Sequence, residues 1–368
     1  NEDTYREDLN NVVAAYNEEG YYDARVLSDT TYIADEGQYG QDPDEMIIEL
    51  TVHEGPQYHI RDITWEGNTV FSDARLTQVL GIRKGDVFNR TKMQENLQGN
   101  RRGTDVSGLY MNRGYMFFNA QPTVIQAPGD SVDVVFDVQE GDIFEFGQVN
   151  ITGNTKTKDH VIRRELYTLP GQTFSRAAIQ RSIRQLQQLG YFSQQSLQSS
   201  PQVNPNQQDQ TVDLTYSLEE TGSDQLELSG GWGGGAVGLL LQASVTFNNF
   251  SAGGMFDGSA WRPIPAGDGQ KLSLSVQMGG RTYQNYSLSF QEPWFRGQPH
   301  PVGVSLSHYR EDFGRYQSYT NRLYGQTGTR TGSSGSTFAV TRASLSYGRR
   351  LDWPDDYFQT NWELGYQF

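Results

Sequence analysis

An alternating pattern fills the sequence FQTNWELGYQF at Phe358–Phe368. Phe, Thr, Trp, Leu and Tyr occupy every second position, and Gln, Asn, Glu and Gly stand between them. A β-strand places successive side chains on opposite faces, so one face of this segment can meet an apolar medium while the other lines something wet. The same period of two recurs at Lys271–Met278, Tyr286–Gln291 and Val302–Ser307. We therefore predict an antiparallel β-sheet throughout Asp224–Phe368.

A soluble β-sandwich also alternates, but three further features of this stretch favour a membrane β-barrel. Its segments run roughly 9 to 12 residues, which suits tilted strands that cross a hydrocarbon layer. Their polar faces offer Ser, Gln, Asn, Arg and Gly, which leave little for a second sheet to pack on. Aromatic rings crowd the segment ends, as at a membrane–water interface: Phe247, Phe250, Trp294, Phe295, Tyr309, Tyr347, Trp353 and Tyr357. We interpret residues 223–368 as the first strands of a membrane β-barrel, and a soluble all-β domain as the alternative.

The composition narrows the class of protein. Mean hydropathy is -0.66, and no run approaches the roughly 18 apolar residues of a helical membrane span. The net charge of -15 argues against a phosphate-binding surface, so no nucleic-acid partner is expected. The absence of cysteine excludes disulfides and thiolate metal sites. No basic-then-apolar segment follows Asn1, so we expect any signal peptide to have been removed or to lie outside this stretch.

A repeated unit precedes the sheet. The sequence ITWEGNT, ending at Thr69, matches VNITGNT, ending at Thr155, and Gly85 and Phe88 match Gly171 and Phe174 at the same offset. Each copy is predicted to fold as strand, helix, helix, strand, strand. The domain boundaries that follow are a partial repeat at 1–55, complete repeats at 56–142 and 143–222, and the barrel strands at 223–368.

Within the second complete copy, helix signals are clear. Asp159–Leu166 is predicted to be a short helix, and Ser175 to cap a longer one that ends at Gly190. An extended Tyr191–Leu197 and a strand over Val212–Leu218 should follow. The first complete copy has about ten extra residues before its Gly-Tyr pair, including Gly99, Gly103 and Asp105, and we predict a surface loop between two helical pieces.

These motifs, in this order, resemble the POTRA repeats and barrel of BamA-type outer-membrane assembly proteins. The resemblance covers essentially the whole chain and rests on ITWEGN, VNITGN, NRGY at Asn112–Tyr115, QLGYF at Gln188–Phe192 and QEPWF at Gln291–Phe295. The insertion in the first complete copy looks like BamA proteins of the Bacteroidetes-Rhodothermus kind. The family's barrel has sixteen strands and a Val-Arg-Gly-Phe-type motif, which this sequence lacks, so the chain is expected to be a fragment or an incompletely resolved protein.

The resemblance implies the central subunit of the outer-membrane assembly machinery, with its POTRA repeats in the periplasm. Implied partners are unfolded outer-membrane protein precursors, outer-membrane lipid, accessory assembly lipoproteins and periplasmic chaperones. A TamA-like or two-partner secretion translocator is one alternative, and a barrel fused to a hydrolase is another. No catalytic residue, metal site or cofactor is predicted, because the histidines show no ligand or triad spacing. Glu54, Glu140 and Glu219 recur at strand ends, which indicates architecture.

For an assembly factor, an unpaired strand edge is the expected binding chemistry, since backbone N–H and C=O groups bind extended segments of many sequences. The repeats could bind precursors at their sheet edges or act only as a spacer. In the first barrel strand, Gln225–Trp232, glycines weaken packing. They could mark a gate for substrate strands or simply form the first hairpin turn, the role we assign to Gly233–Gly235. The predicted gate edge consists of Leu226, Glu227, Leu228, Ser229, Gly230 and Gly231.

Overall fold

The computed structural model describes residues 2–33, 46–100, 103–232, 238–261, 264–280, 283–312, 337–351, 353 and 359–368. They form two compact units. One comprises Asn1–Asn150, Tyr167–Ser182 and Gln202–Thr215, and the other Ile151–Leu166, Ile183–Pro201 and Tyr216–Phe368. The division runs through the second complete repeat. The domain boundaries predicted from the sequence, at residues 55, 142 and 222, therefore remain a prediction.

The first complete repeat has the predicted order of elements, with its second helix in two pieces. Its elements are β3 (His59–Glu66), α2 (Asp73–Leu80), α3 (Arg90–Leu97), α4 (Val106–Met111), β4 (Asn119–Ala127) and β5 (Ser131–Gln139). The sheet order is β3-β5-β4, in which β3 runs parallel and β4 antiparallel to the central strand. Alternate residues of β5 are buried against the helices, so this repeat has a core of its own.

A loop joins the two helical pieces α3 and α4, as the sequence predicted, but one of its residues does not lie on the surface. Asp105 is buried: it caps α4 by accepting the Gly108 N–H and also accepts the N–H groups of Gly99 and Asn100. Arg176 forms an ion pair with the same carboxylate. A buried charge is tolerated only with such partners, and Gly99, Asn100, Gly108 and Arg176 supply them here.

The second complete repeat contains one helix that the sequence did not predict. Its elements are β6 (Glu145–Thr152), α5 (Asp159–Arg163), α6 (Arg176–Leu189), α7 (Gln194–Gln198), β7 (Gln202–Asn206) and β8 (Thr211–Ser217), with sheet order β6-β8-β7. Ser175 accepts the Ala178 N–H at the start of α6, and Gly190 ends that helix in a left-handed conformation, as predicted. The extended Tyr191–Leu197 was wrong, because Ser193 accepts the Ser196 N–H and starts α7.

The partial repeat consists of α1 (Glu2–Glu18), β1 (Arg25–Ile33) and β2 (Met46–His53), and the two strands pair antiparallel. Its helix and last strand are joined as in the first complete repeat. The Tyr16 hydroxyl donates to Glu54, and the Tyr110 hydroxyl donates to Glu140. Both tyrosines stand four residues before a Gly-Tyr pair, so this contact belongs to the repeated architecture.

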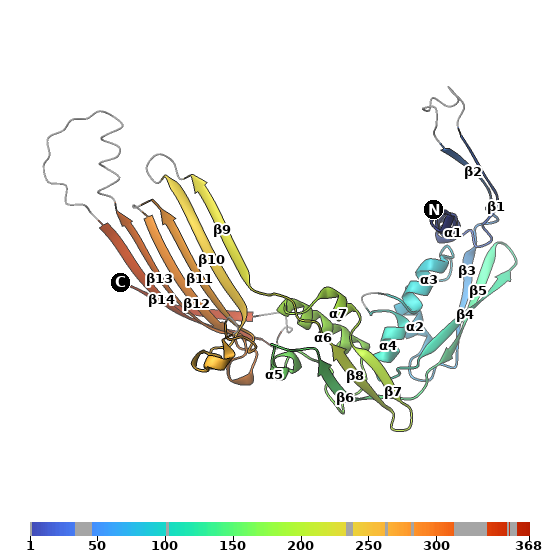
Figure 1. Cartoon of the computed structure of the whole chain (residues 1–368). Helices are drawn as coiled ribbons and strands as arrows, with labels where there is room; N and C mark the ends of the chain where they lie inside the picture. Colours follow the sequence, from blue (N-terminus) through green and yellow to red (C-terminus); the bar gives the residue numbers. More distant parts are fainter. Residues whose placement is uncertain are drawn as a thin grey trace. The chain divides into compact units, whose positions relative to one another are not determined.

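The remaining strands form one antiparallel sheet of seven in sequence order (Figure 1). They are β9 (Gln225–Trp232), β10 (Leu239–Phe250), β11 (Gln270–Gly279), β12 (Tyr283–Glu292), β13 (Val302–Asp312), β14 (Thr337–Arg350) and β15 (Gln359–Gln367). Strands β9 and β15 are the two ends of the sheet, so the described strands do not close into a barrel. None of the helices within the described ranges is long and apolar enough to span a membrane.

The register puts apolar and polar residues on separate faces. On one face Leu274 lies opposite Leu288, which in turn lies opposite Leu306. On the other face small hydroxyl residues form a row across the sheet, in which Thr246 bonds Ser273 and Ser305 bonds Ser344. Since neighbouring strands keep this register, the alternation predicted for single segments builds one apolar and one polar face.

Candidate strand-binding edge

The predicted gate residues all lie on β9, at one end of the sheet. Every residue of this strand is exposed, and its only partner among the described strands is β10. Leu226 and Leu228 continue the apolar face, opposite Val245 and Ala243, and are 67% and 73% exposed. Glu227 and Ser229 continue the polar face. The edge thus combines unpaired backbone with a strict apolar–polar alternation.

Gly230 and Gly231 belong to the strand and not to a hairpin turn. They pair with Leu241 and Leu240 of β10. A methyl group on Gly231 would meet nothing within 4 Å, and one on Gly230 would make only ordinary contacts, with the Leu241 side chain at 3.5 Å and the Leu240 carbonyl oxygen at 3.8 Å. The glycines therefore leave side-chain packing at this end of the strand thin. Gly233–Gly235, the predicted turn, lie outside the described residues.

In an antiparallel pair, successive residues point their N–H and C=O groups alternately toward the partner and away from it. On β9 every second residue of the eight therefore directs its backbone groups away from β10. This row is a template for an added strand, and it discriminates little between side chains. An added strand that alternates in the same way would extend both faces of the sheet.

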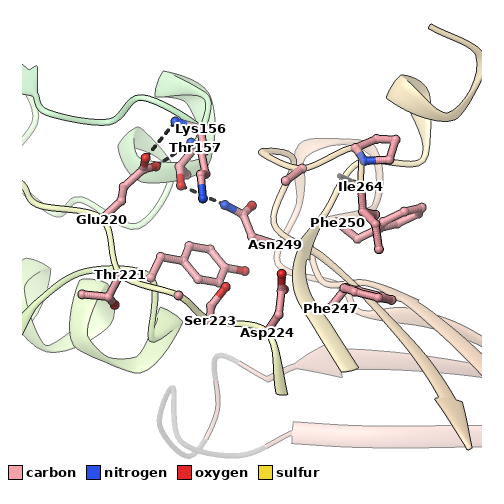
Figure 2. A pocket seen from close by; sticks show the side chains of 14 residues that line it. Lys156, Thr157, Glu220, Thr221, Ser223, Asp224, Phe247, Asn249, Phe250 and Ile264 are labelled. Carbon is pink, nitrogen blue, oxygen red and sulfur yellow. Dashed lines mark hydrogen bonds between the residues drawn. The ribbon is translucent and has the colours of Figure 1, made fainter. Parts of the chain in front are cut away.

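The base of β9 is fixed by Glu220, which the sequence analysis did not single out. Its carboxylate accepts the backbone N–H groups of Lys156 and Thr157 (Figure 2). It also accepts the backbone N–H and the hydroxyl of Thr155. Burial raises the pKa of the Glu220 carboxyl, but hydrogen bonds from Thr157 and Thr155 outweigh it and hold the pKa below its ordinary value. The ionised carboxylate therefore ties the start of the linker between β8 and β9, residues 218–224, to the loop before α5.

The rest of the linker is bonded to Tyr191 and to the end of β10. The Thr221 N–H donates to the Tyr191 carbonyl, and the Tyr191 hydroxyl donates to the Asn248 carbonyl at 2.6 Å. The Asn248 side chain donates to the Ser223 carbonyl. Burial raises the pKa of Tyr191 to about 12, so its hydroxyl keeps its proton and remains a donor.

The loop before α5 also holds the turn between β10 and β11. The Asn249 amide donates to the Thr157 hydroxyl at 2.8 Å, and its oxygen accepts the Gly269 N–H at 2.9 Å. Lys158 forms an ion pair with Asp268 at 2.6 Å. Burial raises the pKa of the Asp268 carboxyl, but hydrogen bonds from Lys158 and Ser251 outweigh it and hold that pKa below its ordinary value.

The far end of α5 is attached to the next turn of the same kind, between β12 and β13. The Trp294 indole donates to Glu165 at 2.8 Å, and the Arg164 guanidinium lies 5.4 Å from the centre of the Trp294 ring. From the sequence, Trp294 was expected only as an aromatic ring at the membrane–water interface and as part of the QEPWF resemblance. The pairing of Trp294 with Glu165 spans 129 residues, and no local signal marks it.

Comparisons with known proteins agree with the geometry. The POTRA model, described as a surface antigen variable number repeat, matches residues 58–141 and 144–221, and the Omp85 superfamily domain matches residues 266–367. The outer membrane protein assembly factor BamA of Neisseria meningitidis serogroup B is 30% identical over 315 residues, which are 84% of this chain and 34% of that protein. This chain is a BamA-type member of the Omp85 superfamily. It belongs to the outer membrane, with its POTRA repeats in the periplasm.

Two further relatives fit this BamA-type assignment. A putative outer membrane protein assembly factor of Treponema pallidum is 28% identical, over 84% of this chain and 34% of that protein. The crystal structure of BamA from Haemophilus ducreyi lacking POTRA domains 1-3 matches with a TM-score of 0.61 at 20% identity, over 84% of this chain and 51% of that one, and supports the fold. The chain spans about a third of the length of the curated relatives. The Bacteroidetes-Rhodothermus resemblance stays a prediction.

Proposed function

We propose that this chain is the part of an outer-membrane assembly factor that receives unfolded β-barrel precursors and passes them into the outer membrane. The observation that carries the proposal is β9 itself, the first strand of a membrane sheet, whose eight residues are exposed and whose outer edge has no partner among the described strands. The names of the relatives support the assembly role over a TamA-like or two-partner secretion translocator.

Strand addition at β9 suits such a task. A precursor strand along all eight residues forms on the order of eight backbone hydrogen bonds, each with a net value of about 1 kcal/mol. Ordering the incoming strand costs about 1 to 2 kcal/mol per residue, so the bonds alone do not hold it. The remaining stabilisation comes from the apolar side chains of the incoming strand, which leave water for the membrane beside Leu226 and Leu228. The edge therefore selects segments in which apolar and polar residues alternate, and it tolerates differences in their exact sequence.

One edge of each complete POTRA repeat is poorly suited to strand addition. Edge strand β4 contains Pro122 and edge strand β7 contains Pro205, each opposite a residue of the central strand. Proline has no N–H to donate and is typical of edges that resist strand addition. We propose that the repeats bind precursors weakly and mainly position β9. Accessory lipoproteins and periplasmic chaperones remain predicted partners, and we assign the protein no enzymatic activity.

Disulfide crosslinking tests the β9 edge, because the sequence has no native cysteine. Glu227→Cys and Ser229→Cys should each form a disulfide with a cysteine in the terminal strand of a stalled barrel precursor. Ser273→Cys and Ser287→Cys are matched controls on the same polar face, where strands pair on both sides. A disulfide requires Cα atoms within about 7 Å, so it reports pairing rather than proximity.

The pattern over the four positions decides the outcome. Crosslinks confined to Glu227→Cys and Ser229→Cys would support the gate. Equal crosslinking at all four positions, or none at the β9 positions while the precursor is bound elsewhere, would rule out β9 as the receiving strand.

A further inference from the structure

The turn between β10 and β11 presents three large apolar side chains to solvent. Its described residues, 251–261 and 264–269, include two 3-10 helices, η1 (Gly253–Phe256) and η2 (Gly258–Ala260). Phe256 is 96% exposed, Trp261 50% and Met255 47%. Trp261 and Met255 touch, since the indole N–H donates to the Met255 carbonyl at 3.2 Å. Single exposed apolar residues are ordinary on protein surfaces, but three in one turn form a patch.

The polar groups of this turn are bonded on its inner side. The Ser251 N–H donates to the Pro265 carbonyl, and the Ser251 hydroxyl accepts the Gly254 N–H. The Ala252 N–H donates to the Gln270 side chain at 2.6 Å. These hydrogen bonds order the turn and satisfy its polar groups, while Met255 and Phe256 stay exposed. A binding partner of this turn should therefore contact apolar side chains rather than supply polar groups.

The patch continues the apolar face of the sheet. Phe250, at the start of the turn, is buried, and its ring meets Phe290 of β12 edge-on at 6.4 Å. Phe290 lies opposite Leu272 on the apolar face. Figure 2 shows Ile264, from the end of the turn, beside Phe250. The turn thus extends the surface that meets lipid, not the polar face.

The depth of the turn is set by β10. The apolar residues from Leu239 to Phe247 span about 26 Å of strand, or about 20 Å across the membrane at a tilt of about 40°. The hydrocarbon belt of such barrels is about 25 Å tall. Ser251 comes four residues after Phe247, roughly 10 Å further along the membrane normal. This places the turn within the headgroup layer, which is about 5 to 8 Å thick on each side.

We propose that the β10–β11 turn is a membrane-interface anchor, in which Met255, Phe256 and Trp261 insert among the lipid headgroups of the periplasmic leaflet. Its charge supports lipid over a charged protein partner: Asp257, Arg262 and Asp268 are its charged residues, and Asp268 is paired with Lys158. Trp and Phe favour this layer of a membrane. Because β10 pairs directly with β9, the anchor holds the neighbour of the receiving strand at a fixed depth while a new strand is added.

Depth-dependent fluorescence quenching tests the anchor in the full-length protein reconstituted in phosphatidylcholine vesicles. Phe256→Cys carries an environment-sensitive nitrobenzoxadiazole label, and the vesicles contain nitroxide lipids labelled near the headgroup or near the chain end. Leu288→Cys, in the middle of the apolar face, is the lipid control. Gln208→Cys, exposed in the β7–β8 turn of a POTRA repeat, is the aqueous control. No precursor is present, so the result is independent of the assembly function.

Label at Phe256→Cys should lose most of its emission to the headgroup nitroxide and little to the chain-end nitroxide, whereas Leu288→Cys shows the reverse order and Gln208→Cys responds to neither. Met255→Cys should give the same result as Phe256→Cys, and it tests the anchor if the Phe256→Cys variant does not fold. Quenching like that of Gln208→Cys would overturn the anchor. Emission at Phe256→Cys that is shielded from nitroxides and from aqueous iodide alike would overturn it in favour of a protein partner.

Discussion

Gly67→Ala should destabilise the first complete repeat much more than Gly85→Ala. The two glycines have nearly the same backbone conformation, with φ of +86° and +89°. A Cβ on Gly67 would lie 2.4 Å from the carbonyl oxygen of Val138, whereas a Cβ on Gly85 would meet nothing within 4 Å. Val138 pairs with Ala120 inside the sheet, so its carbonyl cannot easily move.

The two substitutions share every cost except the clash. A left-handed conformation costs a residue with a Cβ about 1 to 2 kcal/mol, and the stiffer unfolded chain offsets about 0.4 to 1 kcal/mol of that. Forcing an atom into a packed site adds about 1 to 3 kcal/mol at Gly67 alone. We expect Gly85→Ala to lower the free energy of unfolding by about 1 kcal/mol and Gly67→Ala by about 2 to 4 kcal/mol.

Urea unfolding of residues 56–222, followed by circular dichroism, measures the difference between the two variants. The midpoints should separate while the slopes stay equal. Equal losses at the two positions would refute the reasoning, because they would mean that the Val138 carbonyl yields freely and that only backbone conformation requires Gly67.

Three further predictions concern the repeats and the base of β9. Residues 56–220 should be soluble and unfold cooperatively without detergent, since their cores need no lipid; an aggregated product would contradict the predicted boundaries. The carboxyls of Glu220 and Asp268 both have a folded pKa below the ordinary value, which is 4.5 for Glu220 and 3.8 for Asp268. The attachment of α5 to the sheet should therefore be at full strength above these ordinary values, and it should weaken as the pH falls through the lower folded values. Glu220→Gln should flatten this acid dependence of thermal unfolding. Trp294→Phe should speed proteolysis near α5 through the lost bond to Glu165, whereas Trp353→Phe, on an exposed side chain, should not.

Periodic patterns predicted the fold because they report physics that acts along a single segment. Alternation in Lys271–Met278 follows directly from the geometry of a strand, and the sheet keeps it, with Leu274 on the apolar face and Ser273 on the polar face. Glycines that recur at the turns and helix ends of both complete repeats indicated where each helix and strand begins and ends. The gate edge was predicted from the glycines of the first barrel strand and from the family resemblance, and the structure adds that Gly230 and Gly231 are paired strand residues.

Side-chain capping is where sequence reasoning failed. Ser193 can continue an extended chain or start a helix, and only its bond to the Ser196 N–H decides for α7. Asp105 in a glycine-rich segment suggests a surface loop, yet Arg176 supplies a partner 71 residues away that makes burial favourable. Such choices depend on groups distant in sequence. The contacts at the base of β9 also join residues far apart in sequence, and no local sequence pattern predicts them.

The repeated glutamate shows how an error of one residue changes a role. We named Glu219 as the counterpart of Glu140, but Glu140 accepts the N–H groups of Thr69 and Val70 in the first complete repeat, and it is Glu220 that accepts those of Thr155 and Lys156 in the second. Glu219 instead accepts a bond from Ser193. Neighbouring residues of an extended chain point in opposite directions, so only one of the pair can reach the Gly-Asn turn.

The glycines explain why that register is fixed. A Cβ on Gly153 would meet the Leu218 carbonyl oxygen, as one on Gly67 would meet that of Val138, so each turn packs on the strand end two residues before its glutamate. In the second repeat the same strand end leads into β9. A device that closes each POTRA turn therefore also sets where the receiving strand begins, and loss of Glu220 should disturb the gate as well as the repeat.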